Sequence, residues 1–98
     1  MDIIYFRNWL INQNKNKKII SDIISRIKKV ELLIGSSIDE QYKKDSCDFL
    51  LSLFNNKGIN DQMNNFIINS NVSMPIGKYH LSAYKYAVNT YINYLKSL

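Results

Sequence analysis

The chain has 98 residues, of which 46% are hydrophobic and 21% charged, as in an ordinary globular protein, and this length suits one domain covering residues 1–98. One Pro and three Gly argue against linkers and turn-rich sheets, so composition favours helices. The single Cys excludes an intramolecular disulfide, and no apolar run approaches the ~20 residues of a membrane span, so we expect a cytoplasmic protein without a membrane segment.

Charge is distributed unevenly along the chain. Residues 1–34 carry a net charge of +4, residues 35–77 carry −2 and residues 78–98 carry +3, which together give the total of +5. If the first and last helices pack together, their polar faces form one positive surface, which is typical of nucleic-acid-binding proteins. The alternative is that these charges only keep a small protein soluble.

The first expected helix covers residues 2–14. Ile3, Phe6 and Leu10 recur on one side of it at helical spacing, with Trp9 beside them. This apolar side needs a partner, and the isoleucine-rich segment that follows supplies one. We therefore expect the first two helices to form an αα-hairpin in which the aromatic side chains pack on isoleucines.

The second expected helix covers residues 16–35, with Asn16 as its N-cap and Gly35 as its C-terminal stop. Ile20, Ile23 and neighbouring apolar residues form a stripe on one side, which must be buried. The opposite side offers an extended basic and polar surface. It carries Lys17, Lys18, Ser21, Ser25, Lys28 and Lys29.

The middle of the chain is expected to hold a third helix, a short helix and a loop. Ser37 and Glu40 form a capping-box pattern, so the third helix begins there and continues to about residue 54. A short helix over residues 60–69 and an extended loop over residues 71–77, which contains the only proline, follow. The expected buried face of the third helix consists of Ile38, Tyr42, Phe49 and Leu53, flanked by Leu50.

The last expected helix covers residues 79–98. Its polar side carries Lys78, Lys85 and Lys96, and its apolar positions follow steps of three and four: Leu81, Tyr84, Val88, Tyr91, Leu95 and Leu98. This stripe either packs in the core of the monomer or, if it stays partly exposed, supports a homodimer. Such a homodimer would cover Tyr91, Tyr94, Leu95 and Leu98, and Tyr86, outside the stripe, is a further candidate interface residue.

Together these segments predict an all-α fold, a compact bundle of four to five helices. The chain has no P-loop, dinucleotide fingerprint or GxSxG motif. His80 and Cys47 are the only His and Cys, which are too few for a zinc site. We expect Cys47 to be a buried thiol within the third helix and His80 to be a capping or surface residue. The sequence therefore predicts neither an enzyme nor a bound metal or cofactor.

Three segments carry a resemblance to a known family. Phe6-x-x-Trp9-Leu10 opens the chain, a helix over residues 16–30 follows a polar turn, and the segment AVNTYINYL over residues 87–95 closes it. Their order resembles the SAM-like core-binding N-terminal domain of tyrosine recombinases and phage integrases, without the catalytic domain of those enzymes. The resemblance implies a helical domain that clamps DNA and would place Lys17, Lys18, Ser21, Lys28 and Lys85 against the phosphate backbone.

Two functions remain open from the sequence. The first is a non-enzymatic DNA-binding module whose candidate contacts are Lys17, Lys18, Ser21, Ser25, Lys28, Lys29, Lys78, Lys85 and Lys96. The second is a small phage-type protein that binds and inhibits a host protein, such as a nucleic-acid-handling defence complex, in the manner of an anti-CRISPR inhibitor. Its basis is the small size, the absence of catalytic motifs and the surplus of Tyr and Asn outside the apolar stripes, which suits a polar interface with aromatic anchors.

Overall fold

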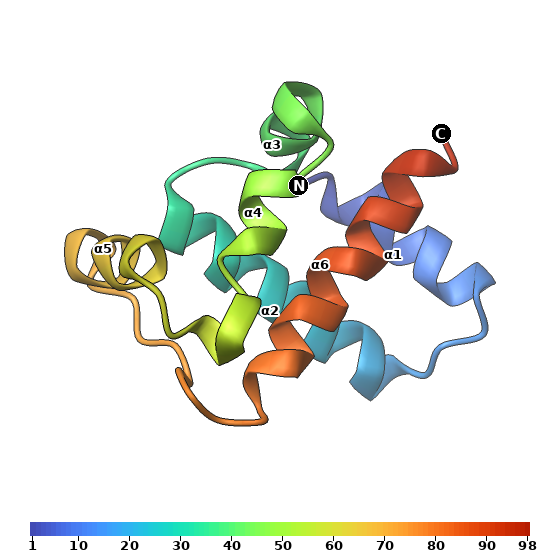
Figure 1. Cartoon of the computed structure of the whole chain (residues 1–98). Helices are drawn as coiled ribbons and strands as arrows, with labels where there is room; N and C mark the ends of the chain where they lie inside the picture. Colours follow the sequence, from blue (N-terminus) through green and yellow to red (C-terminus); the bar gives the residue numbers. More distant parts are fainter.

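Six α-helices and no strand make up the computed structural model, which describes residues 1–98 (Figure 1). The prediction of an all-α bundle is confirmed, with one helix more than expected. None of the helices combines the length and the apolar character needed to cross a bilayer. In chain order the elements are α1 (Ile3–Asn12), α2 (Lys17–Ile34), α3 (Ile38–Asp45), α4 (Asp48–Ser52), the short 3₁₀ turn η1 (Asn55–Gly58), α5 (Asp61–Ser70) and α6 (Leu81–Lys96).

Local caps set both ends of α2 and the start of α3, as the sequence predicts. The Asn16 side chain accepts a hydrogen bond from the Ile19 N–H at 2.9 Å, and Gly35 ends α2 in the left-handed conformation with φ +66°. The Ser37 hydroxyl accepts a hydrogen bond from the Glu40 N–H at 3.1 Å. These caps satisfy N–H groups that have no partner inside their helix, so helix boundaries follow short-range signals here.

The isoleucine stripe of α2 lies at the centre of the core. Ile20, Ile23, Ile27 and Val30 are buried, and α2 packs against α1, α5 and, most extensively, α6. Figure 1 shows α2 passing behind α6. Each fully buried Ile or Val side chain contributes about 1.5–3 kcal/mol to the free energy of folding. The prediction that this stripe is buried is therefore confirmed, and α2 serves as the support on which the other helices pack.

Aromatic rings join α1 to α6. The Phe6 ring meets the Tyr91 ring edge-on at 4.7 Å between centroids and the Tyr94 ring at 5.3 Å, and Trp9 meets Tyr94 at 5.7 Å. Burial raises the pKa of both tyrosine hydroxyls. The aromatic side chains of α1 therefore pack on tyrosines of α6. The sequence predicted isoleucines of the second helix as their partners and did not indicate these tyrosines.

This packing corrects the expected homodimer interface. Tyr91 and Tyr94 are buried inside the monomer, and Leu95 is half-buried against the same core, so the first two offer no surface to a second copy. Tyr86 is exposed, and Leu98 keeps 82% of its surface in solvent. The regular stripe of α6 is mainly a core contact of the monomer. The prediction that this stripe continues to Leu98 is wrong, because Leu98 is exposed.

The third expected helix is in fact two helices. Ser46 and Cys47 both adopt left-handed backbone conformations, with φ of +60° and +68°, and separate α3 from α4. This break changes the rotational phase of the second half, so Leu50 is buried while Phe49, expected in the core, is 39% exposed. The prediction of one continuous helix with Phe49 on its buried face is therefore wrong, and Cys47 lies between helices instead of within one.

The break predicts the effect of Ser46→Gly. Glycine adopts the left-handed conformation without the steric cost of about 1 kcal/mol that a side chain meets there, so we expect the variant to be about 0.5–1 kcal/mol more stable. Urea denaturation followed by circular dichroism measures this change. Lys43→Gly, inside α3, is the matched control and should lose about 0.5–1 kcal/mol. A loss of stability in Ser46→Gly would instead indicate a continuous helix.

Candidate functional site

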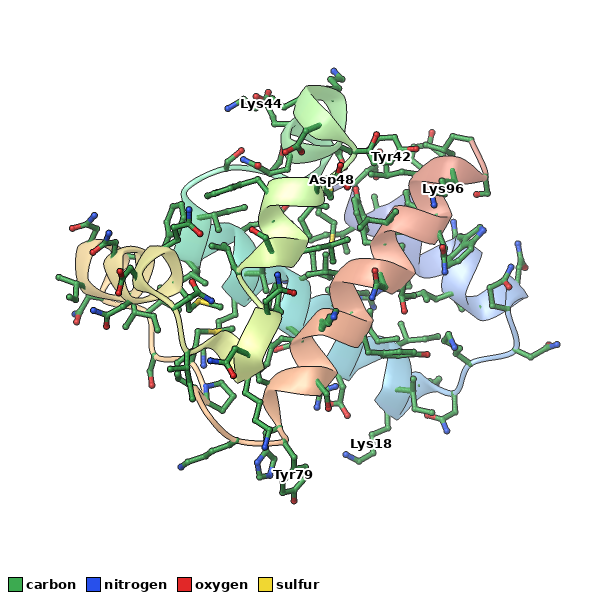
Figure 2. All side chains as sticks on the ribbon, viewed as in Figure 1. Lys18, Tyr42, Lys44, Asp48, Tyr79 and Lys96 are labelled. Carbon is green, nitrogen blue, oxygen red and sulfur yellow. The ribbon has the colours of Figure 1, made fainter.

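Negative charge gathers at the α3–α4 end of the molecule. Burial of the Cys47 thiol raises its pKa, and the nearby carboxylates of Asp45, Asp39 and Asp48 raise it further. Figure 2 shows Asp48 in the upper half of the view and Tyr79 at the lower edge. The end of the molecule around the start of α6 therefore lies away from these three carboxylates.

Cationic side chains surround two adjoining hollows at the start of α6. The hollows have volumes of about 300 Å³ and 470 Å³, Lys78 lines both, and no carboxylate lines either. The smaller hollow lies between η1 and α6, and the larger one lies between α2 and the loop before α6. We call the five cations that line them the basic corner: Arg26, Lys29, Lys57, Lys78 and Lys85.

A backbone contact holds η1 beside the loop that leads to α6. The Gly77 N–H donates a hydrogen bond to the Lys57 carbonyl oxygen at 2.9 Å. Gly58 has a φ of +79°, and a Cβ there would lie 2.8 Å from side-chain atoms of both Ile76 and Leu81, so any other residue would strain the backbone and displace these two side chains. The result is that Lys57 and the residue after Gly77, Lys78, occupy neighbouring positions.

Two lysine–tyrosine contacts connect the α2 side of the molecule to α6. Lys29 Nζ donates a hydrogen bond to the Tyr84 hydroxyl at 3.4 Å and lies 5.6 Å from the centre of its ring. Lys15 Nζ makes the same pair of contacts with Tyr86, at 3.0 Å and 5.7 Å. The hydrogen bond from Lys15 lowers the pKa of Tyr86. These contacts place the Lys29 ammonium group beside the Tyr84 ring, where Lys29 lines the larger hollow of the basic corner.

No residue of the basic corner forms an ion pair. The lysines and arginines of this protein make a single ion pair, between Lys18 and Asp22 at 3.6 Å on the surface of α2, where such a pair contributes little to stability. None of the five positive charges of the basic corner thus has a carboxylate in salt-bridge contact.

The structure separates the candidate contacts that the sequence grouped together. Lys29, Lys78 and Lys85 belong to the basic corner, while Lys96 lies in the last turn of α6, about 22 Å from its start at 1.5 Å per residue. Figure 2 shows Lys96 far from Tyr79. The remaining candidates are exposed on the outer face of α2 and comprise Lys17, Lys18, Ser21, Ser25 and Lys28. Lys96 therefore does not join the positive surface predicted for the two end segments.

Sequence analysis missed two residues of the basic corner. Arg26 falls at the border of the polar face of α2, where helical spacing alone does not decide its direction. Lys57 lies in the acidic middle of the chain, and the hydrogen bond that brings it beside Lys78 spans 20 residues, from Lys57 to Gly77. The Gly58 turn was the one local sign of irregular backbone here, and it does not indicate a partner.

The only cysteine and the only histidine show no catalytic arrangement. Cys47 is fully buried, as predicted, and its Sγ contacts the Ile38 carbonyl oxygen at 3.7 Å. His80 is an exposed residue that precedes α6 and makes no side-chain capping bond. No group of three or more His, Cys, Asp or Glu side chains is placed to hold a metal ion. The chemistry that the site offers is thus positive charge and hydrogen-bond donation.

The thiol of Cys47 is expected to be inert while the chain is folded. Burial raises its pKa to about 11, so at pH 8 only about one molecule in a thousand carries a thiolate. Reaction with a chromogenic disulfide should therefore be slow in buffer and fast in denaturing urea. Labelling at the rate of a free thiol in native buffer would contradict the burial of Cys47.

No protein-family model matches the chain, and the searches of curated proteins and of solved structures match nothing either. The resemblance to integrase core-binding domains stays a prediction that depends on the three segments quoted above. The function must therefore be argued from the geometry and charge of the basic corner.

Proposed function

We propose that the chain is a non-enzymatic DNA-binding module that holds the phosphate backbone in the basic corner. One observation carries this proposal: five cations from α2, η1, the loop before α6 and α6 itself surround two adjoining hollows, and no carboxylate lines them. The five cations come from segments far apart in the sequence, so folding is needed to bring them together. A single basic segment does not account for the cluster.

Physical chemistry favours an anionic occupant. Unpaired like charges repel one another, so gathering them at one end of a small protein costs folding free energy. A polyanion in the hollows removes that repulsion and releases counterions from its own phosphates. Hydroxyl groups of Ser73 and Tyr84 also line the larger hollow and supply neutral donors for phosphate oxygens.

The outer face of α2 extends the proposed contact. Lys17, Lys18 and Lys28 are exposed along this helix, whose other flank contributes Arg26 and Lys29 to the basic corner. A DNA strand that leaves the larger hollow along α2 would meet these lysines next. We therefore assign them a weaker, peripheral role, and we exclude Lys96 from the contact because it lies at the far end of α6.

Three charge-matched variants test this assignment. The basic-corner variant is Lys57→Gln/Lys78→Gln/Lys85→Gln, and its matched control, Lys43→Gln/Lys44→Gln/Lys96→Gln, removes the same charge from exposed positions away from the hollows. At ~50 mM salt we expect the first to weaken DNA binding at least about tenfold, and the slope of log K against log salt to become about 2 to 3 less negative. Fluorescence anisotropy of a labelled DNA measures both quantities.

The third variant, Lys17→Gln/Lys18→Gln/Lys28→Gln, should fall between the other two in affinity. Equal losses in the basic-corner variant and the matched control would show that only net charge matters and would remove the basic corner as a site. Failure of the unchanged protein to bind any DNA at ~50 mM salt would overturn the proposed function itself.

A further inference from the structure

Tyr79 presents an aromatic ring to solvent within the basic corner. It lies between Lys78 and His80 in the turn that begins α6, and 77% of its surface is exposed. Its ring stacks on the His80 ring, with 4.1 Å between centroids and 27° between planes. Tyr79 lines the smaller hollow together with Lys57 and Lys78. Figure 2 shows its side chain extending from the lower edge of the molecule.

The backbone of Tyr79 takes part in hydrogen bonds of the fold, whereas its ring lies outside the buried core. The Tyr79 carbonyl oxygen accepts hydrogen bonds from the Ser82 N–H at 3.0 Å and the Ser82 hydroxyl at 2.7 Å, and these bonds fix the turn. The Tyr79 hydroxyl has no hydrogen-bond partner, and the ring contributes nothing to the buried core. The large Tyr79 ring is thus exposed to solvent on a hydrogen-bonded turn, and it stacks on the His80 ring.

We propose that the basic corner binds single-stranded DNA and that an unpaired base stacks on the Tyr79 ring. This inference rests on the proposed function and narrows its ligand to a strand with free base faces. Proteins that bind single strands combine a positively charged path for the backbone with aromatic rings on which bases stack. Lys57, Lys78 and Lys85 supply the charge around the smaller hollow, and Tyr79 supplies the ring at its edge.

A duplex cannot use this arrangement fully. Its bases are paired and stacked on one another, so it presents phosphates to the lysines but no base face to Tyr79 except at an open end. A single strand of the same length presents both. The structure therefore predicts that the contribution of Tyr79 appears only with a ligand that carries unpaired bases.

Three DNA probes of about 12 nucleotides separate charge from stacking. The first is oligothymidylate, the second is an abasic strand with the same phosphates and no bases, and the third is a fully paired duplex without a loop. We expect the unchanged protein to bind oligothymidylate about tenfold more tightly than the abasic strand. Tyr79→Ala should remove that advantage and leave the affinities for the abasic strand and the duplex unchanged, while Tyr79→Phe should keep it. Tyr5→Ala, at another exposed tyrosine on α1, is the matched control and should change nothing.

The outcomes distinguish this inference from the proposed function. Equal binding of oligothymidylate by Tyr79→Ala and the unchanged protein would overturn the stacking inference, and the proposed function would stand if the basic-corner variant still loses affinity for all three probes. If neither Tyr79→Ala nor the basic-corner variant loses affinity, both the stacking inference and the proposed function would be overturned. Ring resonances of Tyr79 in the unchanged protein provide a second measurement that does not depend on folding of a variant. They should shift upfield with oligothymidylate and stay in place with the abasic strand, and no shift would contradict the inference.

Discussion

The packing of α2 against α6 is the contact on which the rest of the structure depends. It buries the apolar stripe of α2, where Ile23, Ile27 and Val30 each contribute about 1.5–3 kcal/mol, whereas repulsion between two solvated lysines costs a fraction of 1 kcal/mol. The apolar stripe therefore decides the rotation of α2 about its axis. Once that rotation is fixed, Arg26 and Lys29 lie on the flank nearest the start of α6, and the basic corner follows from the core.

Glu31 shows how the same helix separates charge between the two ends of the molecule. In the sequence it stands close to Lys28 and Lys29 and offsets one positive charge of α2. In the structure its carboxylate accepts a hydrogen bond from the Ile38 N–H at 2.9 Å and so ties the end of α2 to the start of α3. The Glu31 carboxylate therefore bonds at the α3 end of the molecule, and it does not line either hollow of the basic corner.

Short-range signals predicted most helices of this fold, because caps and apolar spacing act within a few residues. Asn16, Gly35 and Ser37 mark helix ends through bonds to residues three or four positions away. The left-handed pair at Ser46–Cys47 had no such signal, since neither residue type favours that conformation, although its N–H groups bond to the carbonyl oxygens of Tyr42 and Gln41 in α3. The basic corner was predictable only in part for a related reason. The sequence indicated its cations on α2 and near α6. The position of Lys57, however, depends on the hydrogen bond from the Gly77 N–H, which forms only in the folded chain.

The side chains of the basic corner limit what the proposed complex can recognise. Four of its five cations are lysines, whose ammonium groups act as mobile point charges, and only Arg26 has the planar group that forms paired hydrogen bonds to a base edge. Tyr79 would contact the face of a base, which every base possesses. Charge and stacking are both tolerant of sequence. The proposed interface therefore distinguishes a strand with free bases from a closed duplex more readily than it distinguishes one DNA sequence from another.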